Sequence, residues 1–176
     1  MIHNTINKIN IRESFFLKEK IKIAVELRSQ GKLEESNEIM KKLVKEYPES
    51  AEVNYQCAWS FDVLSLEKEA VPYYEKAIAG DLNDEDMQEA YIGIGSTYRV
   101  IGRYKDSEKV LKKGMELFPE NRAMQIFYAM ALYNLDSHKE AMEIILRNLA
   151  ETSDEVEIKK FSKAIQFYSD KLDKIW

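Results

Sequence analysis

Glycine, proline and cysteine are scarce in this chain of 176 residues, which has six glycines, three prolines and one cysteine. So few turn-forming residues favour helices joined by short loops. The single cysteine, Cys57, has no partner for an intramolecular disulfide and lies in an apolar helical stretch. We therefore expect a buried, unreactive thiol at this position.

The chain also lacks an excess of basic residues. Its formal net charge is −5, and lysine and arginine alternate with glutamate and aspartate along the sequence. Because nucleic-acid binding depends on neutralising phosphate charges, this pattern argues against a nucleic-acid partner. No stretch reaches the ~18 apolar residues of a membrane span, and the N-terminus lacks the apolar run of a signal peptide. We therefore expect a cytoplasmic protein with no membrane partner.

Residues suited to catalysis or metal binding are equally sparse. The two histidines, His3 and His138, have no cysteine or carboxylate at the spacing of metal ligands. Carboxylate pairs such as Glu34 with Glu35 lie in polar runs that are typical of solvated helix faces. The glycines of YIGIGSTYRVIG imitate a nucleotide-binding loop, but Tyr98 stands where the third glycine belongs. We expect no enzyme activity, no cofactor and no metal.

A repeated helical pattern dominates the rest of the chain. In residues 88–121, apolar and small residues follow three- and four-residue spacings on both sides of Gly102, which indicates a helix, a turn and a second helix. The same marks recur 71 residues earlier, where Gly31 takes the place of Gly102. Two periods of about 34 residues account for this offset if three residues are inserted near 81–87.

This period, with small residues where paired helices would cross, resembles the tetratricopeptide repeat (TPR) family. The unit at 88–121 matches the family at seven positions, which are Tyr91, Ile94, Gly95, Tyr98, Ser107, Leu111 and Pro119. The resemblance covers about residues 11–153. It implies an all-α fold, a right-handed superhelix (α-solenoid) of four helix-turn-helix units at 17–50, 51–84, 88–121 and 122–153. A C-terminal capping helix would follow at 154–176, and residues 1–10 would be an N-terminal extension, for which disorder is one alternative.

Glycine and capping residues sharpen this prediction. Gly95 lies in mid-helix, where glycine costs about 1 kcal/mol relative to alanine, so we expect a paired helix to approach it closely. Helix starts are predicted at Asn10, Ser137 and Asp154, each three residues before a glutamate, which is the spacing of a capping box. Two helices per unit and one at the C-terminus make nine.

The resemblance also implies where a partner would bind. In this family the first helix of each unit lines the concave side of the superhelix. The corresponding partner-binding positions here are Tyr55, Trp59, Asp62, Ile92, Ser96, Arg99, Ile126, Met130, Tyr133 and Asn134. Their apolar and aromatic character suits a peptide or an amphipathic helix of another protein, with Trp59 as the anchor. The alternative is that Trp59 packs in the core.

The expected function is therefore a non-catalytic protein–protein interaction module or scaffold. Some members of this family bind the terminal carboxylate of a partner with a clamp of lysine, asparagine and arginine side chains. Ile21 and Val25 replace the first lysine and asparagine of this clamp here, so we do not expect that ligand. A small TPR chaperone that holds a client protein is the alternative. The C-terminal stripe of Ile158, Phe161, Ile165, Tyr168, Leu172 and Ile175 would either cap the last unit or form a homodimer.

Overall fold

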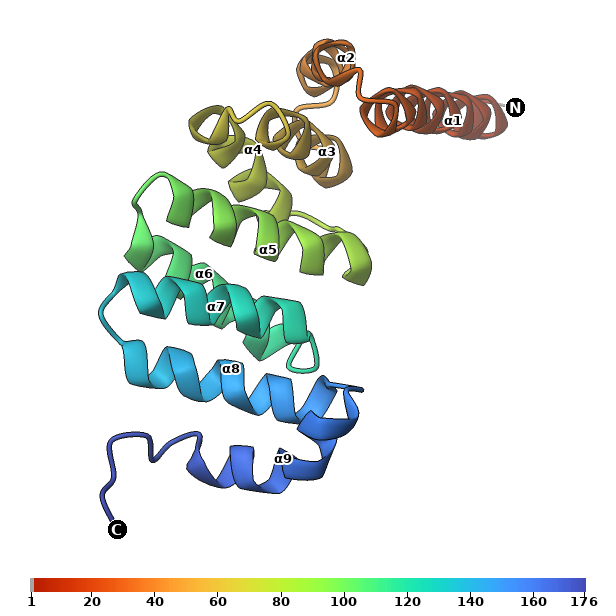
Figure 1. The fold of residues 1–176 in the computed structure, drawn as a ribbon. Helices are drawn as coiled ribbons and strands as arrows, with labels where there is room; N and C mark the ends of the chain where they lie inside the picture. The colour runs from red at the N-terminus through yellow and green to blue at the C-terminus, as the bar shows by residue number, and fades with distance from the viewer. Residues whose placement is uncertain (1) are drawn as a thin grey trace. The chain divides into compact units, whose positions relative to one another are not determined.

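The computed structural model describes the backbone of residues 2–176 and the side chains of residues 15–176. Within this part of the chain, nine α-helices and no strands are present (Figure 1). The helices are α1 (Ile2–Ser29), α2 (Leu33–Glu46), α3 (Ala51–Asp62), α4 (Glu67–Ala79), α5 (Asp84–Val100), α6 (Tyr104–Leu117), α7 (Arg122–Asn134), α8 (His138–Thr152) and α9 (Val156–Tyr168). The predicted all-α fold of four helix-turn-helix units and a further helix is confirmed.

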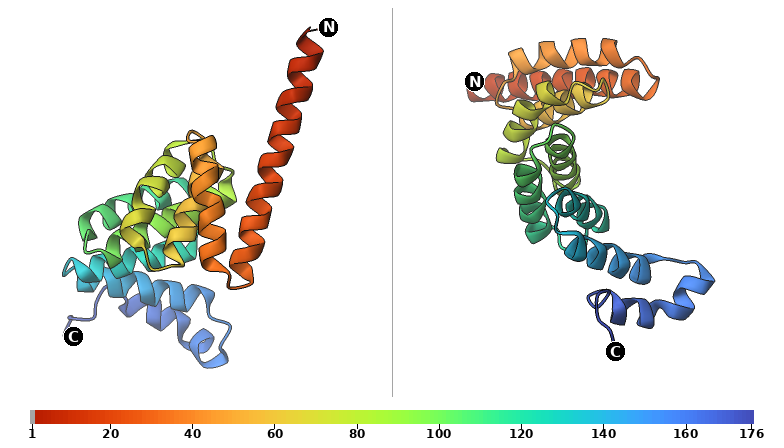
Figure 2. Two further views of the ribbon diagram at one scale, coloured as in Figure 1. Left: turned by 90° about the horizontal axis from the view of Figure 1, so that it is seen from above. Right: turned by 60° about the vertical axis from the view of Figure 1, so that its left-hand side comes forward.

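The chain forms two compact units, residues 1–90 and 91–176, and the boundary between them falls within α5. In the first unit α1 packs on α2 and α3 packs on α4. Figure 2 shows α1 extending well past the end of α2, because its helical backbone continues through residues 2–10. In the second unit α7 packs on both α6 and α8, and α9 packs on α8.

All four hairpin turns share one backbone conformation. Gly31, Ser65, Gly102 and Asp136 each have a positive φ, between 57° and 81°. The residue that follows each of them donates its N–H to a carbonyl five positions earlier, as Lys32 does to Leu27 and Arg103 to Tyr98. This is the Schellman arrangement that ends a helix. The left-handed residues are spaced as the repeat predicts, with a three-residue insertion between Ser65 and Gly102.

Small residues bring the paired helices into close contact. A Cβ atom added at Gly95 of α5 would lie 2.4 Å from Cγ of Leu111 on α6, so even an alanine would force Leu111 to move. Gly114 of α6 is enclosed in the same way, since its Cβ would lie 2.5 Å from Sδ of Met124. The close approach predicted for Gly95 is therefore confirmed.

Buried serines tie two of these crossings together. Ser36 Oγ donates a hydrogen bond to the carbonyl of Ala24 at 2.7 Å, and Ser107 Oγ donates to the carbonyl of Gly95 at 2.6 Å. Both serines are fully buried, so the bond also satisfies a hydroxyl that has no access to water. The sequence predicts the small size of these residues but not their hydrogen bonds.

The predicted helix caps are wrong. Ser137 does precede α8, but its backbone (φ −83°, ψ 50°) is not extended and its side chain accepts no capping hydrogen bond. Asp154 lies one residue before the actual cap position of α9, Glu155. Asn10 lies inside the helical backbone of α1, and its side chain is outside the described residues.

Side-chain caps occur instead where the backbone is extended before a helix. Ser50 Oγ accepts from the N–H of Val53, and Asn121 Oδ1 accepts from the N–H of Met124 at 2.9 Å. Both residues have the extended φ and ψ that this cap requires. The helix starts after the tight hairpin turns lack this geometry, because the preceding residue belongs to the Schellman turn.

Gly95→Leu should lower the free energy of unfolding by about 1–3 kcal/mol, because the larger side chain would overpack the contact with Leu111. Lys112→Leu is a matched control that adds leucine at an exposed position of α6. Urea denaturation monitored by circular dichroism measures both variants. Equal stability of Gly95→Leu and Lys112→Leu would contradict this crossing.

Exchanging glycine at the left-handed turn positions should change stability in opposite directions. Gly102→Ala should cost about 1 kcal/mol from backbone strain alone, since the new Cβ would meet no atom within 4 Å. Ser65→Gly should add about 0.5–1 kcal/mol, because relief of that strain exceeds the extra freedom of the unfolded chain. Thermal melting of both variants checks the two signs, and a stabilising Gly102→Ala would overturn the argument.

Candidate functional site

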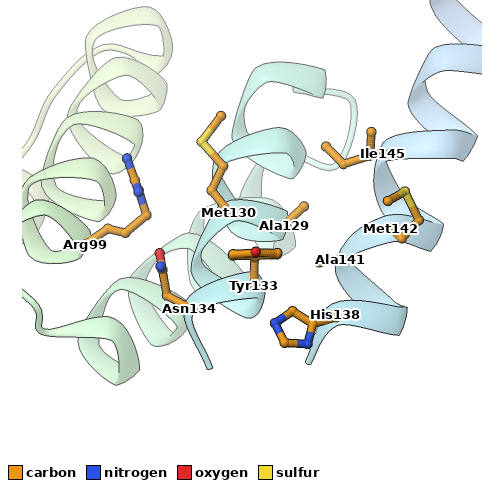
Figure 3. Close-up of a pocket in the computed structure, with 9 residues that line it drawn as sticks. All are labelled: Arg99, Ala129, Met130, Tyr133, Asn134, His138, Ala141, Met142 and Ile145. Carbon is orange, nitrogen blue, oxygen red and sulfur yellow. The ribbon is translucent and has the colours of Figure 1, made fainter. Parts of the chain in front are cut away.

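A pocket of about 420 Å³ lies on α7 and α8 in the second unit, with one side chain contributed by α5 (Figure 3). We call it the α7–α8 pocket. Its lining residues are Arg99, Ala129, Met130, Tyr133, Asn134, His138, Ala141, Met142 and Ile145. Most of the lining surface is apolar. The pocket exists because both helices carry alanine at its base, where Ala129 and Ala141 are buried.

Large apolar side chains stand exposed around this pocket. Tyr133 is 62% exposed, Met142 is 47% exposed and Met130 is 39% exposed. The ring of Tyr133 packs edge-on against His138, with 4.7 Å between the ring centroids, which fixes one wall. Exposed methionine and tyrosine side chains of this kind adapt to the surface of a binding partner.

Two polar atoms of the pocket residues are buried without a hydrogen-bond partner. They are Nε of Arg99, which is a donor, and Oδ1 of Asn134, which is an acceptor. A buried polar atom without a partner costs free energy, and binding a complementary group removes that cost. Both atoms lie beneath the protein surface, so they mark polar groups that the chain itself leaves unsatisfied beside a mainly apolar pocket.

Four of the ten predicted partner-binding residues come together here, namely Arg99, Met130, Tyr133 and Asn134. Three others on α5 and α7 are partly exposed but do not line the pocket, namely Ile92, Ser96 and Ile126. Sequence reasoning missed the contribution of α8, because the resemblance directs attention to the first helix of each unit. The spacing of His138, Met142 and Ile145 along one face of α8 could have pointed to it.

The remaining predicted residues lie in the first unit and differ among themselves. Tyr55 is buried, with 2% of its surface exposed, and its hydroxyl donates to Oε2 of Glu89 at 2.5 Å. Burial and the hydrogen bond to Glu89 raise the pKa of Tyr55 far above its usual value. Asp62 Oδ2 accepts a 2.8 Å hydrogen bond from the Tyr74 hydroxyl. Tyr55 thus has little surface to offer a partner.

Trp59 combines both roles that the sequence leaves open. It is 37% exposed, and the guanidinium carbon of Arg28 lies 3.9 Å from the centre of its ring. Arg28 is held in place because Nη2 donates to Oε1 of Gln56 at 2.7 Å. Burial lowers the pKa of Arg28, opposed by the nearby Tyr55, Tyr74 and Glu89. One face of Trp59 is therefore packed against this arginine, while part of the side chain remains accessible.

The structure offers little for other kinds of chemistry. Burial raises the pKa of the fully buried Cys57 thiol to about 12, so a reactive thiolate is not expected there. Among residues 15–176 no three histidine, cysteine or acidic side chains gather closely enough to hold a metal ion. In the described part of the chain no helix has the length and apolar character needed to cross a membrane.

Comparison with known proteins gives one family match. Residues 51–172 match the family model described as "Tetratrico peptide repeat". The yeast (Saccharomyces cerevisiae) protein "Superkiller protein 3" is 26% identical over 127 residues, which is 68% of this chain and 9% of that protein. The chain thus spans less than a tenth of the curated relative's length.

Solved structures share the fold at low sequence identity. MamA (residues 41 to the end) from Desulfovibrio magneticus RS-1 has a TM-score of 0.68 and 18% identity, over 79% of this chain and 78% of that one. A structure of the APC/C hetero-tetramer Cut9-Hcn1 has a TM-score of 0.69 and 13% identity, over 85% of this chain and 29% of that one.

Proposed function

Because the chain belongs to the tetratricopeptide repeat family, we propose that it is a non-catalytic interaction module that binds a segment of a partner protein. The observation that carries this proposal is the α7–α8 pocket, whose mouth exposes Met130, Tyr133 and Met142. Similarity to a protein solved in a hetero-tetramer, Cut9-Hcn1, supports a protein partner. The proposed ligand is a peptide or a helix that places an apolar side chain between α7 and α8.

The other predicted residues take secondary parts in this proposal. Ile92, Ser96 and Ile126 would extend the contact surface along α5 and α7. Trp59 would supply a separate contact on the first unit through its accessible part. Tyr55, whose ring lies 5.9 Å from that of Trp59, would act indirectly by positioning Trp59, and Asp62 would act by holding Tyr74.

Cross-linking from the pocket tests this function. A photoreactive benzoylphenylalanine in place of Tyr133 should link to one discrete partner protein in a lysate of the source cells. The same amino acid at Lys112, which does not line the pocket, should not. Met142→Ala should weaken the cross-link at position 133, because such contact residues commonly contribute about 1–2 kcal/mol to binding. Equal linkage from both positions would argue against a binding role for the pocket.

A homodimer through the C-terminal helix is the second candidate, and one observation favours it. Helix α9 has no fully buried residue and exposes Val156, Phe161 and Phe167 by half or more of their surface. The predicted stripe is shorter than expected, because α9 ends at Tyr168 and Trp176 folds back to stack on Phe167, with ring centroids 5.7 Å apart. Leu172 and Ile175 consequently lie beyond the helix.

Light scattering coupled to size-exclusion chromatography tests the homodimer. We expect the apparent mass to rise with protein concentration, and Phe161→Glu to restore the monomer by placing a charge on the exposed apolar face of α9. Glu157→Gln serves as a control because it changes an exposed acidic residue of the same helix without adding a charge. A mass of one chain at every concentration would rule out this candidate.

A further inference from the structure

Arg99 stands apart from the other arginines whose side chains the structure describes. Arg147 pairs with Glu143 of its own helix, Arg103 pairs with Asp106 in the first turn of α6, Arg122 pairs with Glu151, and Arg28 stacks on Trp59. Among the side chains of residues 15–176, Arg99 makes no hydrogen bond, ion pair or ring contact, and its Nε is buried. Its positive charge therefore lies beside the α7–α8 pocket without an internal counter-ion.

The groups that could complement this charge follow from hydrogen-bond chemistry. A carboxylate accepts from the N–H groups of a guanidinium through charge-assisted hydrogen bonds, which a neutral carbonyl does less strongly. A purely apolar ligand would cover the charge of Arg99 without supplying a counter-ion, which costs free energy. A basic ligand would be repelled. An acidic group is thus the best match for this side of the pocket.

A second pocket adjoins the first and is lined in part by residues near the C-terminus. This pocket of about 380 Å³ shares His138 and Met142 with the α7–α8 pocket, and Leu172 and Asp173 line it. The carboxylate of Asp173 lies 3.8 Å from Nζ of Lys139. An aliphatic residue followed by an acidic residue therefore lines a pocket next to the α7–α8 pocket, with the acidic residue paired to a lysine of α8.

We propose that the α7–α8 pocket binds a partner segment in which an aliphatic side chain is followed by an acidic one. The aliphatic side chain would lie between Met130 and Met142, and the acidic side chain would pair with Arg99. This inference rests on the proposed interaction function and specifies the chemistry of the partner.

Methyl NMR of the full chain with ¹³C-labelled methionine tests the proposal. The probes are twelve-residue glycine–serine peptides with Leu-Asp, Leu-Asn, Leu-Lys or Ala-Asp at the centre. The Leu-Asp peptide should shift the methyl signals of Met130 and Met142, while the buried Met40 of the first unit stays unchanged as an internal reference. Replacing Asp by Asn should weaken binding at least about fivefold, since a charge-assisted hydrogen bond is lost.

Variants of the chain separate the two halves of the ligand. Arg99→Gln should remove the preference for Leu-Asp over Leu-Asn while the preference for Leu-Asp over Ala-Asp remains. Its melting temperature should match that of the unmodified chain, because Arg99 has no internal partner to lose. Arg122→Gln makes the same change of charge at an arginine already paired with Glu151, and it should leave the peptide preferences intact.

The possible results also distinguish this inference from the broader function. Equal binding of Leu-Asp and Leu-Asn, stronger binding of Leu-Lys, or no methyl shift with any peptide would overturn the proposed ligand chemistry. None of these results decides whether a partner protein binds the pocket, which the cross-link from position 133 tests independently. A partner linked at Tyr133 that lacks an aliphatic–acidic pair would retain the interaction function and refute this inference.

Discussion

The close crossing of paired helices is the constraint on which the rest of the structure depends. At the best-fitting unit Gly95 lets Leu111 lie directly against the backbone of α5, and Ser107 donates to the carbonyl of that same glycine. A side chain at position 95 would meet Leu111 and force it to move. The helix-propensity cost of a mid-helix glycine, about 1 kcal/mol, is offset by the buried contacts that the short distance permits.

The candidate pocket is a consequence of the same constraint. Ala129 and Ala141 occupy the positions in the fourth unit that correspond to Gly95 and Ser107 in the third. There, the counterpart of the fully buried Leu111 is Ile145, which is only partly buried and lines the pocket. The small residues that allow the helices to cross closely therefore also leave an open space wherever the neighbouring side chains do not fill it.

The sequence predicts the backbone better than it predicts the surface. Its period identifies all four turns and the inserted residues, because the spacing between turns can be counted directly along the sequence. It did not show that Ser65 and Asp136 adopt left-handed conformations. Glycine signals such a conformation because it adopts positive φ without strain, whereas serine and aspartate carry no such signal. The capping boxes failed for a related reason: a suitable side chain cannot cap a helix when the Schellman turn before it fixes a different φ and ψ.

The sequence predicts the binding residues less well than it predicts the fold. The repeat pattern gives the same role to corresponding helices of every unit, although their side chains differ in exposure. Buried Tyr55 and exposed Tyr133 both lie on first helices, yet only the contacts of the folded chain separate a structural tyrosine from an accessible one. Arg99 makes the same point through its charge. An arginine with no internal partner gains no ion-pair stabilisation for its own unit, while its buried Nε carries a desolvation cost. A ligand carboxylate beside Arg99 would supply the missing counter-ion and so create selectivity, because a segment without an acidic group would leave the charge unpaired.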